Sequence, residues 1–329
     1  LGGGLMGSGI CTALALAGVD VLLKEIKPEF LEAGLGRIKA NLGSMVKKGK
    51  MKEDKAAKVF GKVKGTLTYD EFKTVDMVIE AALEDIGLKQ KIFADLEKAC
   101  NPSCVLATNT STIDISLVGQ KTSCPERIIG AHFFSPAHVM KLLEIVRTDK
   151  TSAQAIVDLI ALGKKIKKVP VTVGNCTGFA VNRVFFPYTM AAFMLADLGL
   201  DPYAVDKAVK RDFGMPMGPF RLSDLVGGDV GVHVGANFVE NFSDRVYKTG
   251  LLPSMVQAGR AGEKTKAGFY AYDDKRKQSE CPADIAQFLQ ASRQQSRFAG
   301  KPAPQFSNQD ICEFVMFPVV NEACRVLAE

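Results

Sequence analysis

The stretch GGGLMGSGI at residues 2–10 opens the chain and decides its fold. It contains the pattern Gly2-x-Gly4-x-x-Gly7, and an apolar helical pattern over residues 5–17 follows directly. Glycines in this context allow a tight turn, a close approach of a pyrophosphate to the backbone, and close packing of the helix. The helix N-terminus would then face the phosphates, where its free N–H groups attract negative charge. The stretch therefore predicts a dinucleotide-binding turn.

A carboxylate follows the glycine turn at a suitable distance. Val21-Leu22-Leu23 predicts a second strand that ends at Glu25, eighteen positions after Gly7. A carboxylate at this place can accept hydrogen bonds from the adenosine ribose, and it repels the 2′-phosphate of NADP. The pattern therefore predicts NAD as the cofactor. The alternative is that the glycines only make a turn and that Glu25 is a solvated strand end.

Short apolar runs alternate with helical patterns over the first half of the chain. The expected strands are 19–26, 75–81, 105–108, 128–134, 142–146 and 169–173. The expected helices are 5–17, 28–46 and 88–99. Such alternation predicts an α/β fold with a Rossmann-type doubly wound parallel sheet.

The pattern changes after Gly174, beyond which only helical patterns are found. The expected helices are 178–198, 202–211, 219–226 and 230–242. We therefore expect an NAD-binding Rossmann domain over residues 1–174 and an all-α domain over residues 175–272. The polar, proline-containing stretch 273–308 predicts a linker, and residues 309–329 predict the start of a second, truncated helical repeat.

Composition excludes several classes of protein. The 329 residues are 47% hydrophobic and 24% charged, which is typical of a globular protein of two domains. The net charge of +6 is mild and favours a phosphate-bearing ligand over DNA. Eight cysteines without a C-x-x-C pair indicate reduced thiols in an intracellular compartment, and we expect no metal site.

The apolar opening run, residues 1–23, could be mistaken for a membrane helix. It contains six glycines, and no basic segment precedes it as a signal peptide would require. We therefore expect no membrane span. Because no strand precedes the glycine turn, we also expect the sequence to be a fragment.

A histidine and a glutamate in HFFSPAHVMKLLE, residues 132–144, predict the catalytic site. His132 ends one expected strand and Glu144 lies inside the next, so a short turn can bring their side chains to about 3 Å. Histidine is a suitable base for an alcohol proton near neutral pH, and a carboxylate fixes its tautomer. His138 is the competing base, although it lies in the loop after Pro136. The alternative is that His132 is structural and Glu144 is exposed.

These motifs resemble the L-3-hydroxyacyl-CoA dehydrogenase family in order and spacing. The resemblance extends over residues 1–272 and includes Thr108-Asn109-Thr110-Ser111 and Gly178-Phe179-x-x-Asn182-Arg183. It implies NAD-dependent oxidation of L-3-hydroxyacyl-CoA to 3-ketoacyl-CoA. The residues that it implies are His132 as base with Glu144, Ser111 and Asn182 at the substrate, and Glu84, Lys89 and Asn109 at the cofactor.

One residue departs from the family pattern. Ser135 stands where the family commonly has asparagine, which removes an amide donor and puts one contact beside the nicotinamide in doubt. From the residues alone, capping is the expected role of Asn109, Ser111 and Asn182.

The stretch KAGFYAYDD at residues 266–274, followed by the expected linker and helix, points to one branch of the family. It is similar to the dehydrogenase part of peroxisomal multifunctional proteins of fatty-acid β-oxidation, especially those of plant glyoxysomes. This resemblance implies a peroxisomal (glyoxysomal) location and an enoyl-CoA hydratase module upstream. Val315-Met316-Phe317-Pro318 resembles Val184-Phe185-Phe186-Pro187, so we expect the helical repeat to cover an apolar face and keep the full-length protein monomeric.

Eight lysines fall between Lys47 and Lys64. We expect Lys47 and Lys48 to bind the phosphates of an acyl-CoA substrate, which favours this substrate over a sugar acid or another non-CoA hydroxy acid. RNA or filament binding through the same stretch is a further alternative. The stretch has one aromatic residue, Phe60, and no arginine, so it lacks the stacking groups expected for base recognition, and we do not favour a nucleic-acid partner.

Overall fold

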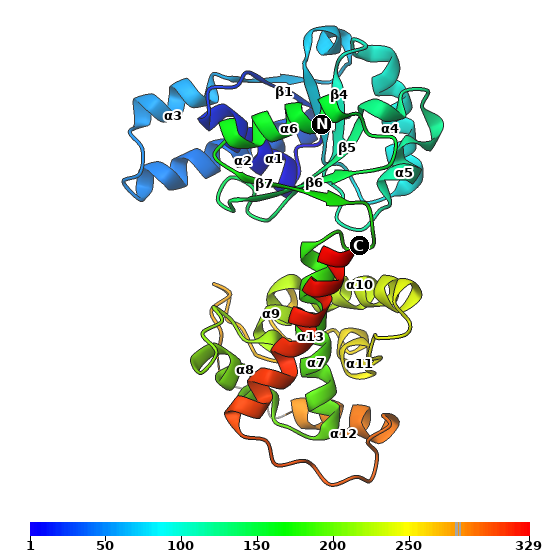
Figure 1. Cartoon of the computed structure of the whole chain (residues 1–329). Coiled ribbons are helices and arrows are strands. Elements are labelled where there is room, and N and C mark those ends of the chain that lie inside the picture. The colour runs from blue at the N-terminus through cyan, green and yellow to red at the C-terminus, as the bar shows by residue number, and fades with distance from the viewer. Residues whose placement is uncertain (280–281, 283) are drawn as a thin grey trace. The chain divides into compact units, whose positions relative to one another are not determined.

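The computed structural model describes residues 1–279, 282 and 284–329, so Cys281 lies outside the described residues. The chain forms two compact units, Leu1–Phe179 and Ala180–Glu329. Figure 1 shows strands and helices in the first unit and helices in the second.

The first unit has mostly parallel strands with helices, as the alternating pattern predicts. Its strands are β1 (Val21–Lys24), β2 (Val63–Thr66), β3 (Met77–Glu80), β4 (Val105–Thr108), β5 (Ile128–Phe133), β6 (Leu142–Arg147) and β7 (Val169–Gly174). Its helices are α1 (Leu5–Leu16), α2 (Pro28–Lys47), α3 (Glu53–Phe60), α4 (Ile86–Ala99), α5 (Ile115–Val118) and α6 (Ala153–Lys165). The expected Rossmann-type fold is confirmed.

The strands pair in two groups, β1-β2 and β3-β4-β5-β6-β7. The first two residues join these groups. The amino group of Leu1 donates to Ile79 O on β3, and Leu1 O accepts from the Ala81 N–H just after it. The Gly2 N–H donates to Lys24 O on β1. All pairs are parallel except β5 with β6. The turn between β5 and β6 is too short for a parallel crossover, which requires a dozen residues or more, so β6 runs back beside β5.

The lysine-rich stretch contains two elements that the sequence did not predict, α3 and β2. Helix α3 has only eight residues and buries only Val59, and β2 reads Val-Lys-Gly-Thr, so each contains few apolar residues. Strand β2 is stabilised by parallel pairing with β1, in which Val21 lies opposite Val63. Tertiary pairing therefore decides a structure that local propensity does not.

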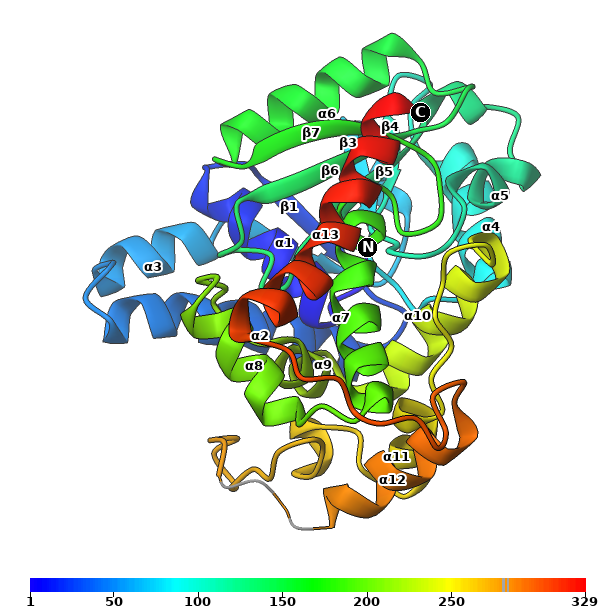
Figure 2. The same ribbon diagram turned by 60° about the horizontal axis from the view of Figure 1, so that its bottom comes forward.

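The second unit contains helices throughout. They are α7 (Val181–Leu198), α8 (Pro202–Arg211), α9 (Pro219–Val226), α10 (Gly228–Asn241), α11 (Leu251–Gln257), α12 (Ile285–Gln295) and α13 (Asn308–Ala328). Helix α13 lies along α7 in Figures 1 and 2, and its Ile311 and Val315 share a buried cluster with Tyr188 and Leu195 of α7. No helix of the described residues has the length and apolarity needed to cross a bilayer.

The segment 273–308 differs from its prediction as a linker, because α12 lies inside it. Ile285 of α12 is buried, and Ser292 donates to the buried carboxylate of Asp197 at 2.6 Å. The few apolar residues of this helix are separated by glutamines and serines, which hid the helical pattern in a polar composition.

The Gly-Phe-Tyr motif near residue 268 is held by a buried carboxylate. Asp224 accepts hydrogen bonds from the backbone N–H groups of Phe269 and Tyr270, each at 2.9 Å, and from the Tyr272 hydroxyl at 2.8 Å. A Cβ atom on Gly268 would lie 2.0 Å from the same carboxylate, so only glycine fits there. The motif therefore has a structural role in this unit.

Candidate active site

His132 on β5 and Glu144 on β6 are direct partners in the antiparallel ladder. Nδ1 of His132 lies 2.7 Å from Oε2 of Glu144, and the two side chains are 7% and 0% exposed. Because an ionised carboxylate only accepts hydrogen bonds, Nδ1 is the donor in this contact, and in the neutral imidazole this leaves Nε2 as the acceptor. The predicted approach of the two side chains is therefore present, and the strand register is what produces it.

Two aromatic rings surround the imidazole. The ring centroids of Phe134 and Phe179 lie 4.5 Å and 5.6 Å from that of His132. Apolar neighbours lower the local dielectric constant, which strengthens the hydrogen bond between His132 and the carboxylate.

The glycine turn has the geometry that a dinucleotide requires. A Cβ atom on Gly2 would lie 2.6 Å from Ala81 O, and one on Gly7 would lie 1.9 Å from Gly2 O, so these positions allow backbone segments to touch. A Cβ atom on Gly4 would meet nothing within 4 Å, so this side of the turn is open. Gly4 is the N-cap of α1, and no side chain caps the helix. The N-terminus of α1 therefore fits the pyrophosphate of NAD.

Glu25 lies beside this turn, immediately after β1. Its Oε1 accepts from the Gly3 N–H at 2.5 Å, and its Oε2 accepts from the Ile26 N–H at 3.1 Å. From α2, the Arg37 guanidinium donates to Gly3 O at 3.0 Å, a contact that the sequence did not reveal. Glu25 is therefore placed at the glycine turn, as expected for a ribose acceptor.

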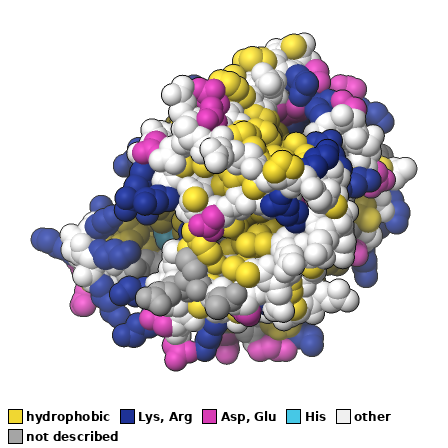
Figure 3. All heavy atoms as spheres, turned by 90° about the horizontal axis from the view of Figure 1, so that it is seen from below, with side chains coloured by type: hydrophobic (Ala, Val, Ile, Leu, Met, Phe, Trp, Pro, Cys, Tyr) yellow, Lys and Arg dark blue, Asp and Glu magenta, His cyan; other side chains and the backbone are white. Residues whose placement is uncertain are grey.

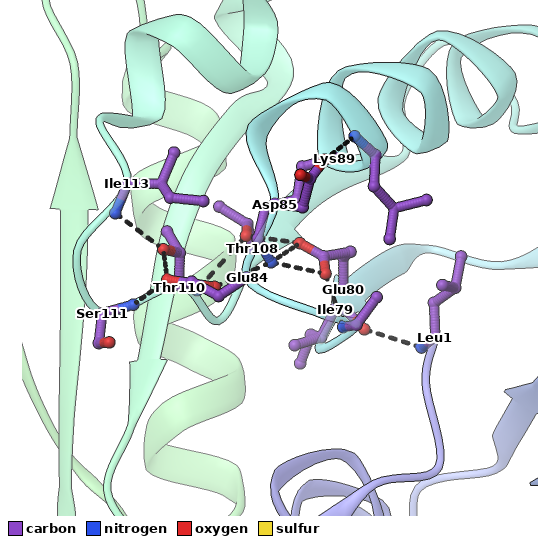
Figure 4. A network of polar contacts seen from close by, with 12 residues as sticks. Leu1, Ile79, Glu80, Glu84, Asp85, Lys89, Thr108, Thr110, Ser111 and Ile113 are labelled. Carbon is purple, nitrogen blue, oxygen red and sulfur yellow. Dashed lines mark hydrogen bonds and ion pairs between the residues drawn. The ribbon is translucent and has the colours of Figure 1, made fainter. Parts of the chain in front are cut away.

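A buried ion pair supports the loop after β3 (Figure 4). The carboxylate of Glu80, at the end of β3, accepts from Lys89 Nζ at 2.8 and 2.9 Å and from the Thr108 hydroxyl at 2.7 Å. Lys89 is 1% exposed and also lies 3.3 Å from Glu84. Glu80 was not among the residues predicted from sequence, because a glutamate ending an apolar strand carries no distinctive motif. Lys89 therefore holds this loop through its contacts with Glu80 and Glu84. Its contact with the cofactor stays a prediction.

Glu84 joins this loop to the one after β4. Its Oε1 accepts from the Thr110 hydroxyl and from the Ser111 N–H at 3.2 Å (Figure 4). Asn109 connects the next strand, since its Oδ1 accepts from the Phe133 N–H at 2.9 Å. The structure thus bonds Glu84 to Ser111, and it joins Asn109, at the end of β4, to β5.

Lys47 and Lys48 lie at the exposed end of α2, and within the described part of the chain neither pairs with a carboxylate. Lys62 and Lys64, in contrast, pair with Asp20 and Glu71 at 3.0 and 2.6 Å. Figure 3 shows basic side chains gathered on the side where α3 lies in Figure 1.

His138, the competing base, has a different environment. Its Nδ1 is buried without a hydrogen-bond partner among the residues described. Burial lowers its pKa, and the positive charges of Lys168 and Lys48 lower it further. The lowered pKa favours the neutral imidazole, and among the described residues no carboxylate pairs with this ring.

For Ser135 and Asn182, the structure gives a position in the fold but, among the residues it describes, no contact that assigns a role. Ser135 is exposed at the start of the loop after β5. Asn182 is the second residue of α7 and belongs to the second unit, so its contact with substrate stays a prediction. Across the described residues, no three His, Cys, Asp or Glu side chains gather as a metal site requires.

Two family models cover most of the chain. Residues 1–176 match the NAD binding domain of 3-hydroxyacyl-CoA dehydrogenase, and residues 178–272 match the C-terminal domain of the same family. FadB2 of M. tuberculosis is a similar solved structure, with a TM-score of 0.80 and 37% identity over 83% of this chain and 97% of that protein.

Longer proteins match the whole chain. A glyoxysomal fatty acid beta-oxidation multifunctional protein of Brassica napus is 59% identical over 100% of this chain and 45% of its own length. The dehydrogenase part of multifunctional enzyme 1 from C. elegans has a TM-score of 0.69 at 28% identity, covering 99% of this chain and 73% of that one. The chain thus spans less than half the length of the plant relative.

Proposed function

Because this chain belongs to the 3-hydroxyacyl-CoA dehydrogenase family, we propose that it oxidises the 3-hydroxyl group of an L-3-hydroxyacyl-CoA to a ketone with NAD. The observation that carries the proposal is the buried pair of His132 and Glu144. This pair provides a base of fixed tautomer in a unit whose glycine turn fits NAD.

In this proposal His132 is the general base. Its Nε2 accepts the hydroxyl proton while the hydride leaves C3 of the substrate, and bound NAD supplies the hydride acceptor. Glu144 keeps its hydrogen bond to Nδ1 and stabilises the positive charge that the imidazole gains. The products are a 3-ketoacyl-CoA, NADH and a proton that His132 returns to solvent.

The cofactor would be held by α1, Glu25 and the loops after β3 and β4. The N-terminus of α1 would bind the pyrophosphate, and Glu25 would accept from the ribose hydroxyls. Glu84, positioned by Lys89, would lie with Asn109 toward the nicotinamide half, and Ser111 with Asn182 would contact the substrate.

The substrate class is proposed from the two lysines that pair with no carboxylate among the described residues. Lys47 and Lys48 would attract the phosphates of CoA, which a free hydroxy acid lacks. A non-CoA hydroxy acid is the alternative substrate, and RNA or filament binding through the same lysines is the alternative role of this surface.

The names of the relatives support proposals about the whole protein. The plant relatives are named glyoxysomal or peroxisomal multifunctional proteins of fatty acid beta-oxidation. We propose the same location, a role in β-oxidation and an upstream hydratase module for the protein that contains this chain.

We propose that residues 1–174 form the NAD-binding domain, that 175–272 form the helical domain, and that the helix from residue 309 begins a second copy of the latter. The packing of α13 along α7 supports the last point. Such a copy would cover the apolar face within one chain and make the full-length protein a monomer. A stable full-length dimer in light scattering would count against it.

The test is NADH formation from L-3-hydroxyacyl-CoA substrates of varied chain length. Free 3-hydroxy acids and the corresponding pantetheine thioesters are the controls. Turnover of the CoA esters, and at a higher KM of the pantetheine thioesters, without turnover of free hydroxy acids supports the proposal, whereas equal turnover of free hydroxy acids favours the alternative substrate.

A further inference from the structure

Lys168 is a buried lysine to which neither the family motifs nor the proposed mechanism gives a role. It lies between α6 and β7 and is 8% exposed. Its Nζ donates to two backbone carbonyls, Ala137 O at 2.6 Å and Met140 O. No carboxylate pairs with it in the part of the chain that the structure describes.

Placing a lysine there is costly. An ammonium group loses favourable hydration when it is buried, and among the described residues two backbone carbonyl groups compensate for that loss. The same loss of hydration lowers the pKa of Lys168. A methionine would fill similar space without this penalty, so the two hydrogen bonds are the contribution that the lysine makes.

Both carbonyls belong to the loop of residues 134–141, which joins β5 to β6. The strand before this loop carries His132 and the strand after it carries Glu144. Most of the loop is exposed, and its own backbone bonds are those from the N–H groups of Val139 and Met140 to Pro136 O. Lys168 therefore ties this loop to the start of β7, beside the backbone bond that the Val169 N–H donates to Lys141 O at 2.8 Å.

The same loop contacts α1, the helix whose N-terminus fits the pyrophosphate of NAD. Ala137 is 2% exposed and packs against Gly9 of α1, where an added Cβ atom would lie 3.1 Å from Ala137 Cβ. Ala137 thus meets Lys168 through its carbonyl group and α1 through its side chain. Ala137 therefore connects the loop that follows β5, the strand of His132, with α1.

We propose that Lys168 is a positioning residue, which clamps the 134–141 loop against α1 and so holds His132 in place relative to the cofactor. This inference rests on the proposed role of His132 as base. A displacement of about 1 Å in a reacting group can reduce turnover about 100-fold, so loss of the clamp should appear in kcat.

The test compares Lys168→Met, which removes the donors, with Lys168→Gln, which retains a shorter donor. Lys165→Met is the matched control, because Lys165 is exposed at the end of α6. For each protein we would measure kcat, the KM for acyl-CoA, NADH affinity by fluorescence, and hydrogen exchange of the peptide containing residues 134–141.

We expect Lys168→Met to lower kcat about 10-fold or more, with the KM for acyl-CoA changed less than about threefold. Exchange in the loop peptide should rise, Lys168→Gln should be intermediate, and Lys165→Met should resemble the unmodified protein. If Lys168→Met does not fold, Lys168→Gln alone must show the lowered kcat and faster loop exchange.

Unchanged kcat and loop exchange in a folded Lys168→Met protein would overturn the proposal. So would a loss of kcat matched by Lys165→Met, or one that appears with unchanged loop exchange. If the unmodified chain oxidises no hydroxyacyl-CoA, the proposed function fails. Loop exchange would still show separately whether Lys168 holds the loop.

Discussion

His132 and Glu144 lie directly opposite each other on β5 and β6, with Nδ1 of the histidine 2.7 Å from Oε2 of the glutamate. The antiparallel ladder fixes this relationship. A register shift of one residue would move Glu144 to the other face of the sheet. The pair is therefore as rigid as the core strands, and only Nε2 remains to exchange a proton with a substrate.

Glu25→Ala is expected to weaken the preference for NAD over NADP. The variant removes a negative charge beside Gly3 that would repel a 2′-phosphate. The ratio of kcat/KM for the two cofactors measures the effect, with Glu29→Ala, at an exposed position of α2, as the control. An unmodified protein that binds NADP more tightly than NAD would refute the assignment.

Gly7→Ala is expected to raise the KM for NAD about tenfold or more. Its Cβ atom would lie 1.9 Å from Gly2 O, so the turn must move, at a cost of about 1–3 kcal/mol. Gly36→Ala is the matched control, because its Cβ atom meets nothing within 4 Å and alanine favours a helix by about 0.5–1 kcal/mol. A Gly7→Ala protein with normal NAD affinity would show that the turn does not approach the cofactor.

Neutralising Lys47 and Lys48 together should raise the KM for acyl-CoA and flatten its dependence on salt. Both side chains are exposed, so their attraction for phosphate is screened over about 8–10 Å at physiological ionic strength. The KM for a pantetheine thioester, which lacks the nucleotide phosphates, should not change. Equal effects on the two substrates would place the CoA nucleotide elsewhere.

Asp206 should make stability depend on pH. Burial raises the pKa of this carboxyl group to about 6, against an ordinary value of 3.8. The folded state therefore binds the proton more tightly, and the resulting stabilisation is complete below pH 3.8 and is lost as the pH rises through about 6. Between these limits the loss is about 2–3 kcal/mol.

The measurement is urea unfolding of the unmodified protein and of Asp206→Asn at several pH values. The difference between their free energies of unfolding should fall as the pH rises from about 4 to 7. Asn retains an oxygen that can accept from the Phe220 N–H, which bonds to Asp206 at 2.8 Å. A difference independent of pH would show that Asp206 titrates normally.

Much of the fold could be predicted because its elements have strong local signals. Helix α8 begins at Pro202 and ends at Arg211 as expected, and β4 matches its predicted bounds. The elements that could not be predicted depend on partners distant in sequence. Strand β2 is stabilised because it pairs with β1. Helix α12 is stabilised because Ile285 is buried in the second unit.

The site also contains residues that could be predicted from the sequence and residues that could not. The spacing of His132 and Glu144 predicted their contact, because a short turn between strands leaves few arrangements. Glu80 and Lys168 had no such signal. Glu80 bonds to Lys89 and Thr108, and Lys168 bonds to two carbonyl groups. These partners become neighbours only when the sheet forms.

The most direct test of the account is single-turnover NADH formation from an L-3-hydroxyacyl-CoA by His132→Ala, Glu144→Gln and His138→Ala proteins. We expect His132→Ala to lose about 10²–10⁴-fold in rate and Glu144→Gln to lose rate as well, both with little change in CoA binding. His138→Ala should retain nearly normal turnover, because its imidazole has no carboxylate partner among the described residues. Near-normal turnover in His132→Ala, together with its loss in His138→Ala, would contradict the assignment of His132 as the base.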